Sequence, residues 1–151
     1  MTPARRRLAT EFESADRSPG LCLWRATNRW QASQRAVLQP FGLTHVQFVL
    51  LASLTWLEQG EPITQRQLAD HAATDPMMTS QVLRALERRG LVRREPHPVD
   101  GRANAVVATG EGVALANRAV KAVEACDRAF FAPLGASVLG FADGLAQLAS
   151  A

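Results

Sequence analysis

Tyrosine is absent from this 151-residue sequence, lysine occurs once, and cysteine occurs twice. Two isolated cysteines form neither a disulfide framework nor a zinc site, and the three histidines show no metal-ligand spacing. The sequence lacks any run of about 18 consecutive apolar residues, so we expect no membrane-spanning helix. Residues 1–18 are polar and arginine-rich. Because they do not resemble a secretory signal, we expect a cytoplasmic protein.

Patterns of catalytic residues are also missing. The sequence has no Ser-His-Asp arrangement, no glycine-rich phosphate loop and no pair of carboxylates at a spacing typical of acid–base catalysis. We therefore expect neither an enzyme nor a bound cofactor.

The positive charge of the chain comes almost entirely from arginine. Seventeen basic residues, of which sixteen are arginine, face 14 acidic ones, so the formal net charge is +3. Residues 62–102 carry seven arginines against five acids, whereas residues 103–151 carry three basic and four acidic residues. A net charge of this size does not by itself indicate nucleic-acid binding, because a solvated surface explains it equally well. A DNA-binding interpretation must rest on geometry.

Helix boundaries are clearly marked in the sequence. Five capping patterns precede periodic apolar runs, and glycine or proline ends most of these runs. The patterns are Ser18-Pro19, Thr44 with Gln47, Thr64 with Gln67, Asp75-Pro76 and Thr109. They predict helices that reach about Leu38, Glu58, Ala72, Arg89 and Pro133, respectively. An amphipathic stripe from Val138 to Leu148 predicts one more helix.

A β-hairpin is predicted between the fourth and fifth of these helices. Residues 91–95 and 103–108 contain short β-branched pieces, and the segment between them holds two prolines and an Asp-Gly pair. A short helix, a tight connection, a second helix and a hairpin form a winged helix-turn-helix. The expected fold class is therefore mainly α, with one small β-hairpin as the wing.

The second helix of this motif, over residues 76–89, has two unlike faces. The apolar face, which we expect to be buried, comprises Met78, Val82, Leu83 and Leu86. The opposite face carries hydroxyl, amide and guanidinium groups, which suit base edges and phosphates. We assign base reading to Ser80, Gln81 and Arg84, and DNA-backbone contacts to Thr64, Gln65 and Arg88. The alternative is a solvated helix surface that reads nothing.

The hairpin tip offers two further candidate DNA contacts. Arg102 beside the turn can enter an adjacent minor groove, where the negative potential is strongest over narrow A·T tracts. His97 can contact a phosphate. As an alternative, Arg102 forms a structural ion pair with Asp100 or Asp75 and thereby orients the wing.

Several segments, in this order and spacing, resemble the MarR (multiple antibiotic resistance regulator) family of bacterial transcription factors. They are Leu43–Leu51, Thr64–Ala69, Ser80–Val92, Arg94, Asp100-Gly101-Arg102 and Thr109–Gly112. With the flanking helices, the resemblance covers nearly all of residues 18–149. It implies a repressor that binds a pseudo-palindromic double-stranded DNA operator as a homodimer and that a small, often aromatic, effector releases.

The expected organisation has three parts: a flexible arm over residues 1–17, a helical dimerisation lobe over 18–42 and 110–151, and a winged DNA-binding domain over 43–109. Apolar residues near the C-terminus exceed what two terminal helices need in a monomer, which independently supports the dimer. They are Leu115, Val123, Phe130, Phe131, Leu134, Phe141, Leu145 and Leu148. An ordinary intramolecular core is the alternative.

The resemblance also suggests where an effector would bind. It places the effector cleft between the two lobes, near Trp24, Arg25, Asn28 and Trp56. Tryptophan can stack on an aromatic ring, and arginine can pair with a carboxylate or phenolate. The alternative is that both tryptophans are core residues.

Two alternative functions remain at this point. One branch of the family senses organic hydroperoxides through a cysteine placed near Cys22, but it supports that cysteine with tyrosines, which this sequence lacks. A free cysteine more often fills apolar space. The other alternative is a winged-helix protein-interaction module that never binds DNA. Salt separates the two classes of binding, because only contacts to several phosphates must weaken steeply with ionic strength.

Overall fold

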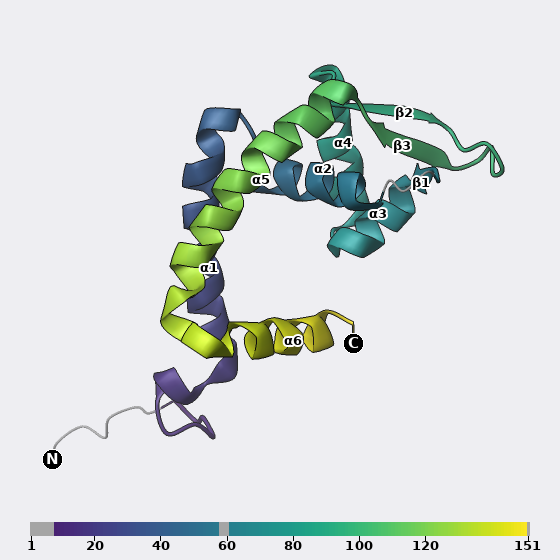
Figure 1. The fold of residues 1–151 in the computed structure, drawn as a ribbon. Helices are drawn as coiled ribbons and strands as arrows, with labels where there is room; N and C mark the ends of the chain where they lie inside the picture. The colour runs from purple at the N-terminus through teal and green to yellow at the C-terminus, as the bar shows by residue number, and fades with distance from the viewer. Residues whose placement is uncertain (1–7, 58–60, 151) are drawn as a thin grey trace, which may run out of the picture.

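The computed structural model describes residues 8–57 and 61–150 and shows a mainly helical chain with one small sheet (Figure 1). The elements are η1 (Ala15–Arg17), α1 (Pro19–Leu38), η2 (Gln39–Phe41), α2 (His45–Leu57), β1 (Ile63–Thr64), α3 (Gln65–Ala72), α4 (Pro76–Arg88), β2 (Val92–Pro96), β3 (Asn104–Ala108), α5 (Gly110–Phe131), η3 (Ala132–Ser137) and α6 (Val138–Ala149). The predicted fold class is confirmed. The predicted end of the second helix, Glu58, lies outside the described residues.

The predicted capping side chains begin the helices. The Thr64 hydroxyl accepts a hydrogen bond from the Gln67 amide at 3.0 Å, and the Gln67 side chain accepts one from the Thr64 amide at 2.9 Å. Thr44 and Gln47 form the same reciprocal pair at the start of α2. Each pair satisfies two backbone donors that the first helical turn leaves free, which explains why these boundaries were legible in the sequence.

The sheet has three antiparallel strands in the order β1-β3-β2, one more than the predicted hairpin. β2 pairs with β3 along the wing, with Val92 opposite Ala108 and Pro96 opposite Asn104. β1 has only two residues, and Ile63 lies opposite Val106. A strand this short has no alternation to detect in the sequence, so only its pairing with β3 defines it.

The core surrounds α2 and includes residues of the neighbouring helices and of the sheet. Its completely buried leucines come from α1, α2, α3 and α4: Leu38, Leu50, Leu51, Leu54, Leu68, Leu83 and Leu86. From α5, Leu115 and Val123 also pack into this cluster. Both were expected to be part of the surplus apolar surface, and this expectation was wrong: they belong to the core of the single chain.

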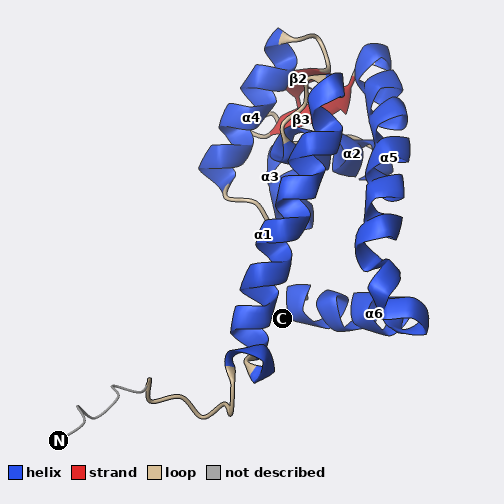
Figure 2. Cartoon of the chain, turned by 90° about the vertical axis from the view of Figure 1, so that its left-hand side faces the viewer, coloured by secondary structure: helices blue, strands red, loops and turns tan. Residues whose placement is uncertain are grey.

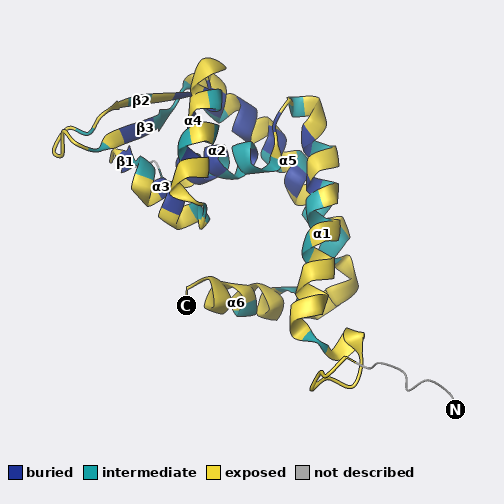
Figure 3. Cartoon of the chain, turned by 180° about the vertical axis from the view of Figure 1, so that it is seen from behind, coloured by how far each residue is buried: buried dark blue, intermediate teal, exposed yellow. Residues whose placement is uncertain are grey.

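The two longest helices, α1 and α5, form a stalk that extends beyond this core. α1 and α5 run side by side, with the winged domain at one end and α6 at the other (Figures 1 and 2). α6 has no buried residue, and Figure 3 shows it exposed along its length. Leu139 is 78% and Leu148 is 70% exposed, so the single chain leaves an apolar helix uncovered.

The C-terminal stretch corrects the expectation that no segment could cross a membrane. Gly110–Ala149 contains an 18-residue window of mean hydropathy 1.4, which is long and apolar enough by composition. Counting consecutive apolar residues missed it because isolated polar residues interrupt the run. The stretch is not one straight helix, however. Gly135 has non-helical torsion angles, φ 55° and ψ −127°, and α6 turns sharply away from α5 (Figure 1).

Candidate nucleic-acid interface

Helix α4 packs on the core through a face that differs from the predicted one. Leu83 and Leu86 are buried as expected, but Thr79 is completely buried and Met78 is 38% exposed. The Thr79 hydroxyl donates to the Asp75 carbonyl oxygen at 2.8 Å and lies 2.7 Å from the Thr74 hydroxyl. These hydrogen bonds compensate for the burial of a polar group. The buried face of α4 therefore contains Thr79, whereas the sequence predicted Met78 there.

The turn that precedes α4 fixes the angle between the two helices of the motif. Asp75 accepts a hydrogen bond from the Met78 amide at 2.9 Å and so caps the helix. Ala73, at the end of α3, has the left-handed torsion angles φ 53° and ψ 41°. A non-glycine residue in this region carries a steric cost, which is tolerated where the surrounding contacts hold the turn.

The opposite side of α4 faces solvent and carries the predicted stripe. Gln81, Arg84 and Arg88 are exposed, and Ser80 is half-buried. The Arg84 guanidinium donates to the Ser80 hydroxyl at 3.1 Å, which holds the arginine along the helix. The described residues give Arg84 no acidic partner. Its guanidinium and the neighbouring amide are therefore available for base edges.

The start of α3 lies beside the wing. The Thr64 hydroxyl is used in capping, and the Gln65 side-chain oxygen accepts from the Arg94 guanidinium at 3.4 Å. The same guanidinium pairs with Glu87 of α4 at 3.4 Å. Glu87 was not among the predicted site residues, because spacing in the sequence does not show which strand residue reaches which helix.

At the wing tip, the predicted polar residues form the turn itself. The Asp100 carboxylate accepts from the Arg102 backbone amide at 3.1 Å. The His97 Nδ1 atom accepts from the Val99 and Asp100 amides at 3.2 and 3.1 Å. In the part of the chain that the structure describes, the Arg102 guanidinium has no ion pair. The predicted alternatives, ion pairs with Asp100 or with Asp75, are therefore both wrong, and the guanidinium is exposed.

A polar groove of about 720 Å³ lies between α3 and the wing. Its lining includes Thr64, Gln65, Arg66, Arg102 and Asn104. The groove joins two predicted backbone contacts, Thr64 at the N-cap of α3 and Gln65 in its first turn, to the predicted wing contact Arg102. Pro76, the first residue of α4, also lines this groove, so the start of the recognition helix borders it.

The four predicted effector residues do not converge in the single chain. Trp24 is 68% and Trp56 is 75% exposed, so the alternative that both tryptophans are core residues is wrong. Arg25 forms an ion pair with Asp16 at 2.9 Å, and the Asn28 side chain donates to the Trp24 carbonyl oxygen. None of the four lines this polar groove or either of two other grooves, which border α1.

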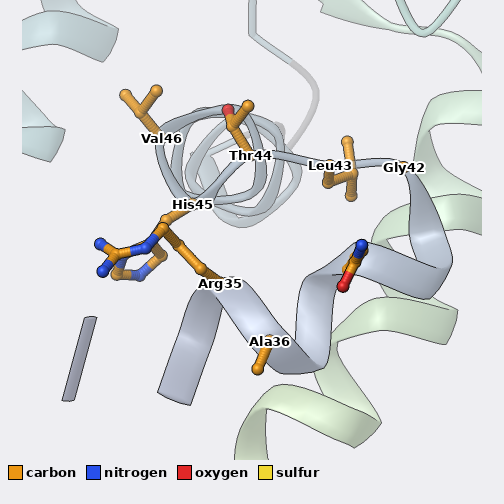
Figure 4. A pocket seen from close by; sticks show the side chains of 8 residues that line it. Arg35, Ala36, Gly42, Leu43, Thr44, His45 and Val46 are labelled. Carbon is orange, nitrogen blue, oxygen red and sulfur yellow. The ribbon is translucent and has the colours of Figure 1, made fainter. Parts of the chain in front are cut away.

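Two other grooves border the stalk. A groove of about 470 Å³ between α1, α5 and α6 has aromatic walls from Trp30, Phe130, Phe131 and Phe141. A second, of about 650 Å³, lies where α1 meets α2. Arg35 and His45 are among the side chains that line this second groove (Figure 4).

A polar cluster joins the stalk to the winged domain beside this junction. The Asp127 carboxylate of α5 accepts from the Trp30 indole and the Gln34 amide of α1, both at 2.8 Å. The Trp30 ring meets the His45 ring edge to face, with 5.0 Å between centroids. Burial lowers the pKa of His45; the Asp127 charge partly opposes this shift and the Arg35 charge adds to it. Sequence reasoning missed the cluster because its members come from three helices.

Cys22 lies at the far end of α1, near η1. It is exposed, so its expected role as a buried apolar filler is wrong. Its thiol lies 3.4 Å from the Asp16 carbonyl oxygen and can donate to it. Among the hydrogen bonds of the described residues, none brings a cationic donor to this sulfur, so the geometry gives no support to the redox alternative.

Comparisons with known proteins agree with this geometry. The sequence model of the MarR family matches residues 43–103. The uncharacterized HTH-type transcriptional regulator YdcH of Bacillus subtilis is 41% identical over 124 residues, which cover 82% of this chain and 84% of YdcH. The HTH-type transcriptional repressor Rv2887 of Mycobacterium tuberculosis is 37% identical over 123 residues, which cover 81% of this chain and 86% of Rv2887.

Solved structures show the same fold. CouR of Rhodococcus jostii, bound to p-coumaroyl-CoA, superposes with a TM-score of 0.81 at 28% identity, over 91% of this chain and 96% of CouR. Rv2887 in complex with DNA superposes with a TM-score of 0.67 at 33% identity, over 87% of this chain and 97% of Rv2887. The chain belongs to the MarR family of winged-helix, DNA-binding transcriptional regulators.

Proposed function

We propose that this regulator is a cytoplasmic repressor that binds a pseudo-palindromic operator as a homodimer and that a small aromatic effector releases it. The observation that carries the proposal is the exposed face formed by α4 and the wing. On this face, Ser80, Gln81 and Arg84 read bases in the major groove. Thr64, Gln65 and Arg88 contact the backbone, and Arg102 enters the adjacent minor groove.

The uncovered apolar surface of the stalk supports the homodimer. α6 has no buried residue in the single chain, and Phe141 and Leu145 line an aromatic groove against α1 and α5. Exposed apolar patches of this kind mark association surfaces. A two-fold dimer covers the same patch on both subunits and places two recognition helices about 34 Å apart, one helical turn of DNA.

The oligomeric state and DNA binding are tested together. Sedimentation velocity at micromolar concentration should show a dimer, and a stable monomer would contradict the proposal. The operator is obtained as the duplex that the protein selects from a randomised pool. The affinity of the protein for this operator should fall steeply between low and high salt, because each phosphate contact releases counterions from the DNA. A protein that selects no duplex and does not bind random DNA even at low salt would instead favour the protein-interaction module.

The effector part of the proposal draws on the ligand of CouR, a thioester of an aromatic acid. We expect an aromatic carboxylic acid, or its thioester, to lower operator affinity. Fluorescence anisotropy of labelled operator, titrated with p-coumaric acid and p-coumaroyl-CoA, measures the release directly. The matched control is cyclohexanecarboxylic acid, which keeps the charge but lacks the aromatic ring. Equal release by the control would contradict recognition of the ring.

A further inference from the structure

The recognition helix carries an acidic residue where two electrostatic effects oppose it. Glu87 lies in the last turn of α4, where the helix dipole disfavours a negative charge. It also lies seven residues after Ser80, on the side of the helix that carries the polar stripe. A carboxylate near the surface that meets polyanionic DNA lowers affinity through charge repulsion. We therefore expect a contact that offsets these two unfavourable effects on the Glu87 charge.

That interaction is with strand β2. One carboxylate oxygen of Glu87 accepts from the Arg94 backbone amide at 3.1 Å, and the other accepts from the Arg94 guanidinium at 3.4 Å. The Arg94 side chain is only 20% exposed, so solvent screens this contact less than a fully exposed ion pair. Both oxygens of one carboxylate thus bind one wing residue, which restricts rotation of the strand against the helix.

Arg94 extends the connection to a third element. Its guanidinium also donates to the Gln65 side chain, at the first position of α3. Opposite Arg94 in the sheet lies Val106 of β3, which is completely buried, so the strand has little room to shift. Glu87, Arg94 and Gln65 therefore link the recognition helix, the wing and the start of α3.

We propose that Glu87 and Arg94 are positioning residues for operator recognition, because they hold α4, the wing and α3 in the one orientation in which all three meet DNA together. This inference rests on the proposed reading of bases by α4. Neither residue needs to touch a base. Glu87 acts through Arg94, and its charge is tolerated because the orientation improves discrimination more than the charge lowers affinity.

The test is Glu87→Gln, with Glu95→Gln as the matched control. Both variants remove one negative charge from the same region, and among the described residues Glu95 forms an ion pair with the exposed Arg93 alone, at 3.6 Å. Removing a negative charge should leave affinity for random DNA unchanged or higher in both variants. Only Glu87→Gln should lower the ratio of operator affinity to random-DNA affinity, by roughly fivefold to tenfold, the lower range for losing one base contact. The reason is that Glu87→Gln replaces one accepting carboxylate oxygen by an amide NH₂, which cannot accept a hydrogen bond from Arg94.

A second pair of variants tests Arg94 itself. Arg94→Lys keeps the charge but cannot reach Glu87 and Gln65 with a planar fork, so discrimination should fall while the salt slope stays unchanged. Arg93→Lys is its control and should behave like the wild type. The double variant of Glu87→Gln and Arg94→Lys should lose no more discrimination than either single variant.

The opposing results are distinct. Glu87→Gln and Glu95→Gln with equal ratios would overturn the positioning role. Equal weakening of operator and random DNA by Glu87→Gln, with an earlier melting transition, would reduce the pair to a stability contact and also overturn it. If the Glu87 and Arg94 variants lose discrimination while Gln81→Ala and Arg84→Ala do not, the positioning role stands and the proposed base-reading set fails. If the wild-type protein binds operator and random DNA with equal affinity, both the positioning role and the proposed base reading are overturned.

Discussion

Gly112 is the residue whose substitution the structure predicts most sharply. It lies in the first turn of α5 and is buried against the end of the α4–β2 connection. A Cβ atom added there would overlap the Leu91 carbonyl oxygen and lie 3.0 Å from the Leu91 carbonyl carbon and 3.3 Å from the Leu51 Cδ1 atom. The first two atoms belong to the backbone, so no side-chain rotation relieves the overlap.

The consequence of Gly112→Ala follows from what the Leu91 carbonyl does. It accepts the Thr109 backbone amide at 3.0 Å, and the Thr109 hydroxyl in turn caps α5 through the Gly112 amide at 3.1 Å. Displacing Leu91 strains or breaks this connection between the wing base and α5. Overpacking costs about 1–3 kcal/mol, and a lost hydrogen bond costs about 1 kcal/mol. Against this, alanine gains about 1 kcal/mol of helix propensity. We expect a net loss of about 1–3 kcal/mol in the free energy of unfolding.

The matched control is Gly110→Ala, two residues earlier in the same helical turn. A Cβ at Gly110 meets nothing within 4 Å, so the substitution should be neutral or stabilise by up to about 1 kcal/mol. Urea denaturation of both variants at one protein concentration measures the difference, because dimer stability depends on concentration. The reasoning is refuted if Gly112→Ala is as stable as Gly110→Ala.

Four further predictions concern DNA binding, pH and oxidation. Gln81→Ala and Arg84→Ala should each lose about 1–3 kcal/mol of discrimination between operator and random DNA, measured by anisotropy; wild-type behaviour in both would mean that the stripe is only solvated. Arg102→Ala should lower the slope of log affinity against log salt by about one per subunit without changing the melting temperature, because its guanidinium forms no ion pair in the described residues; an unchanged slope would remove the direct contact. Burial lowers the pKa of His45 below its usual 6.5, so near that pH the unfolded chain binds more protons than the folded one. The urea midpoint should therefore fall as the pH drops below about 6.5. His45→Asn should make this fall smaller, and an equal fall in the variant would contradict the prediction. Cys22→Ser should leave any release of operator by peroxide unaltered, since the thiol faces carbonyl oxygens, and loss of such a response would instead establish a redox sensor.

Local chemistry explains what the sequence determined by itself. Capping at Thr44, Thr64 and Asp75 depends on side chains that bond backbone amides three positions away, so both partners are visible in one short window. The wing tip is equally local, because Asp100 and His97 bond amides within three residues. Helix order, the hairpin and the polar stripe of α4 followed from such windows, and these features sufficed to indicate a winged helix-turn-helix.

Tertiary structure decided the features that depend on partners distant in the sequence. Thr79 replaced Met78 on the buried face of α4 because Thr74 and the Asp75 carbonyl satisfy its hydroxyl. The pairs Glu87–Arg94 and Gln34–Asp127 join different elements, and the periodicity of the sequence does not predict such pairs. Side-chain type alone also left open whether Trp24 and Trp56 are core residues, and both are exposed. An apolar residue type specifies a preference for burial, but only the arrangement of the helices decides which neighbour covers it.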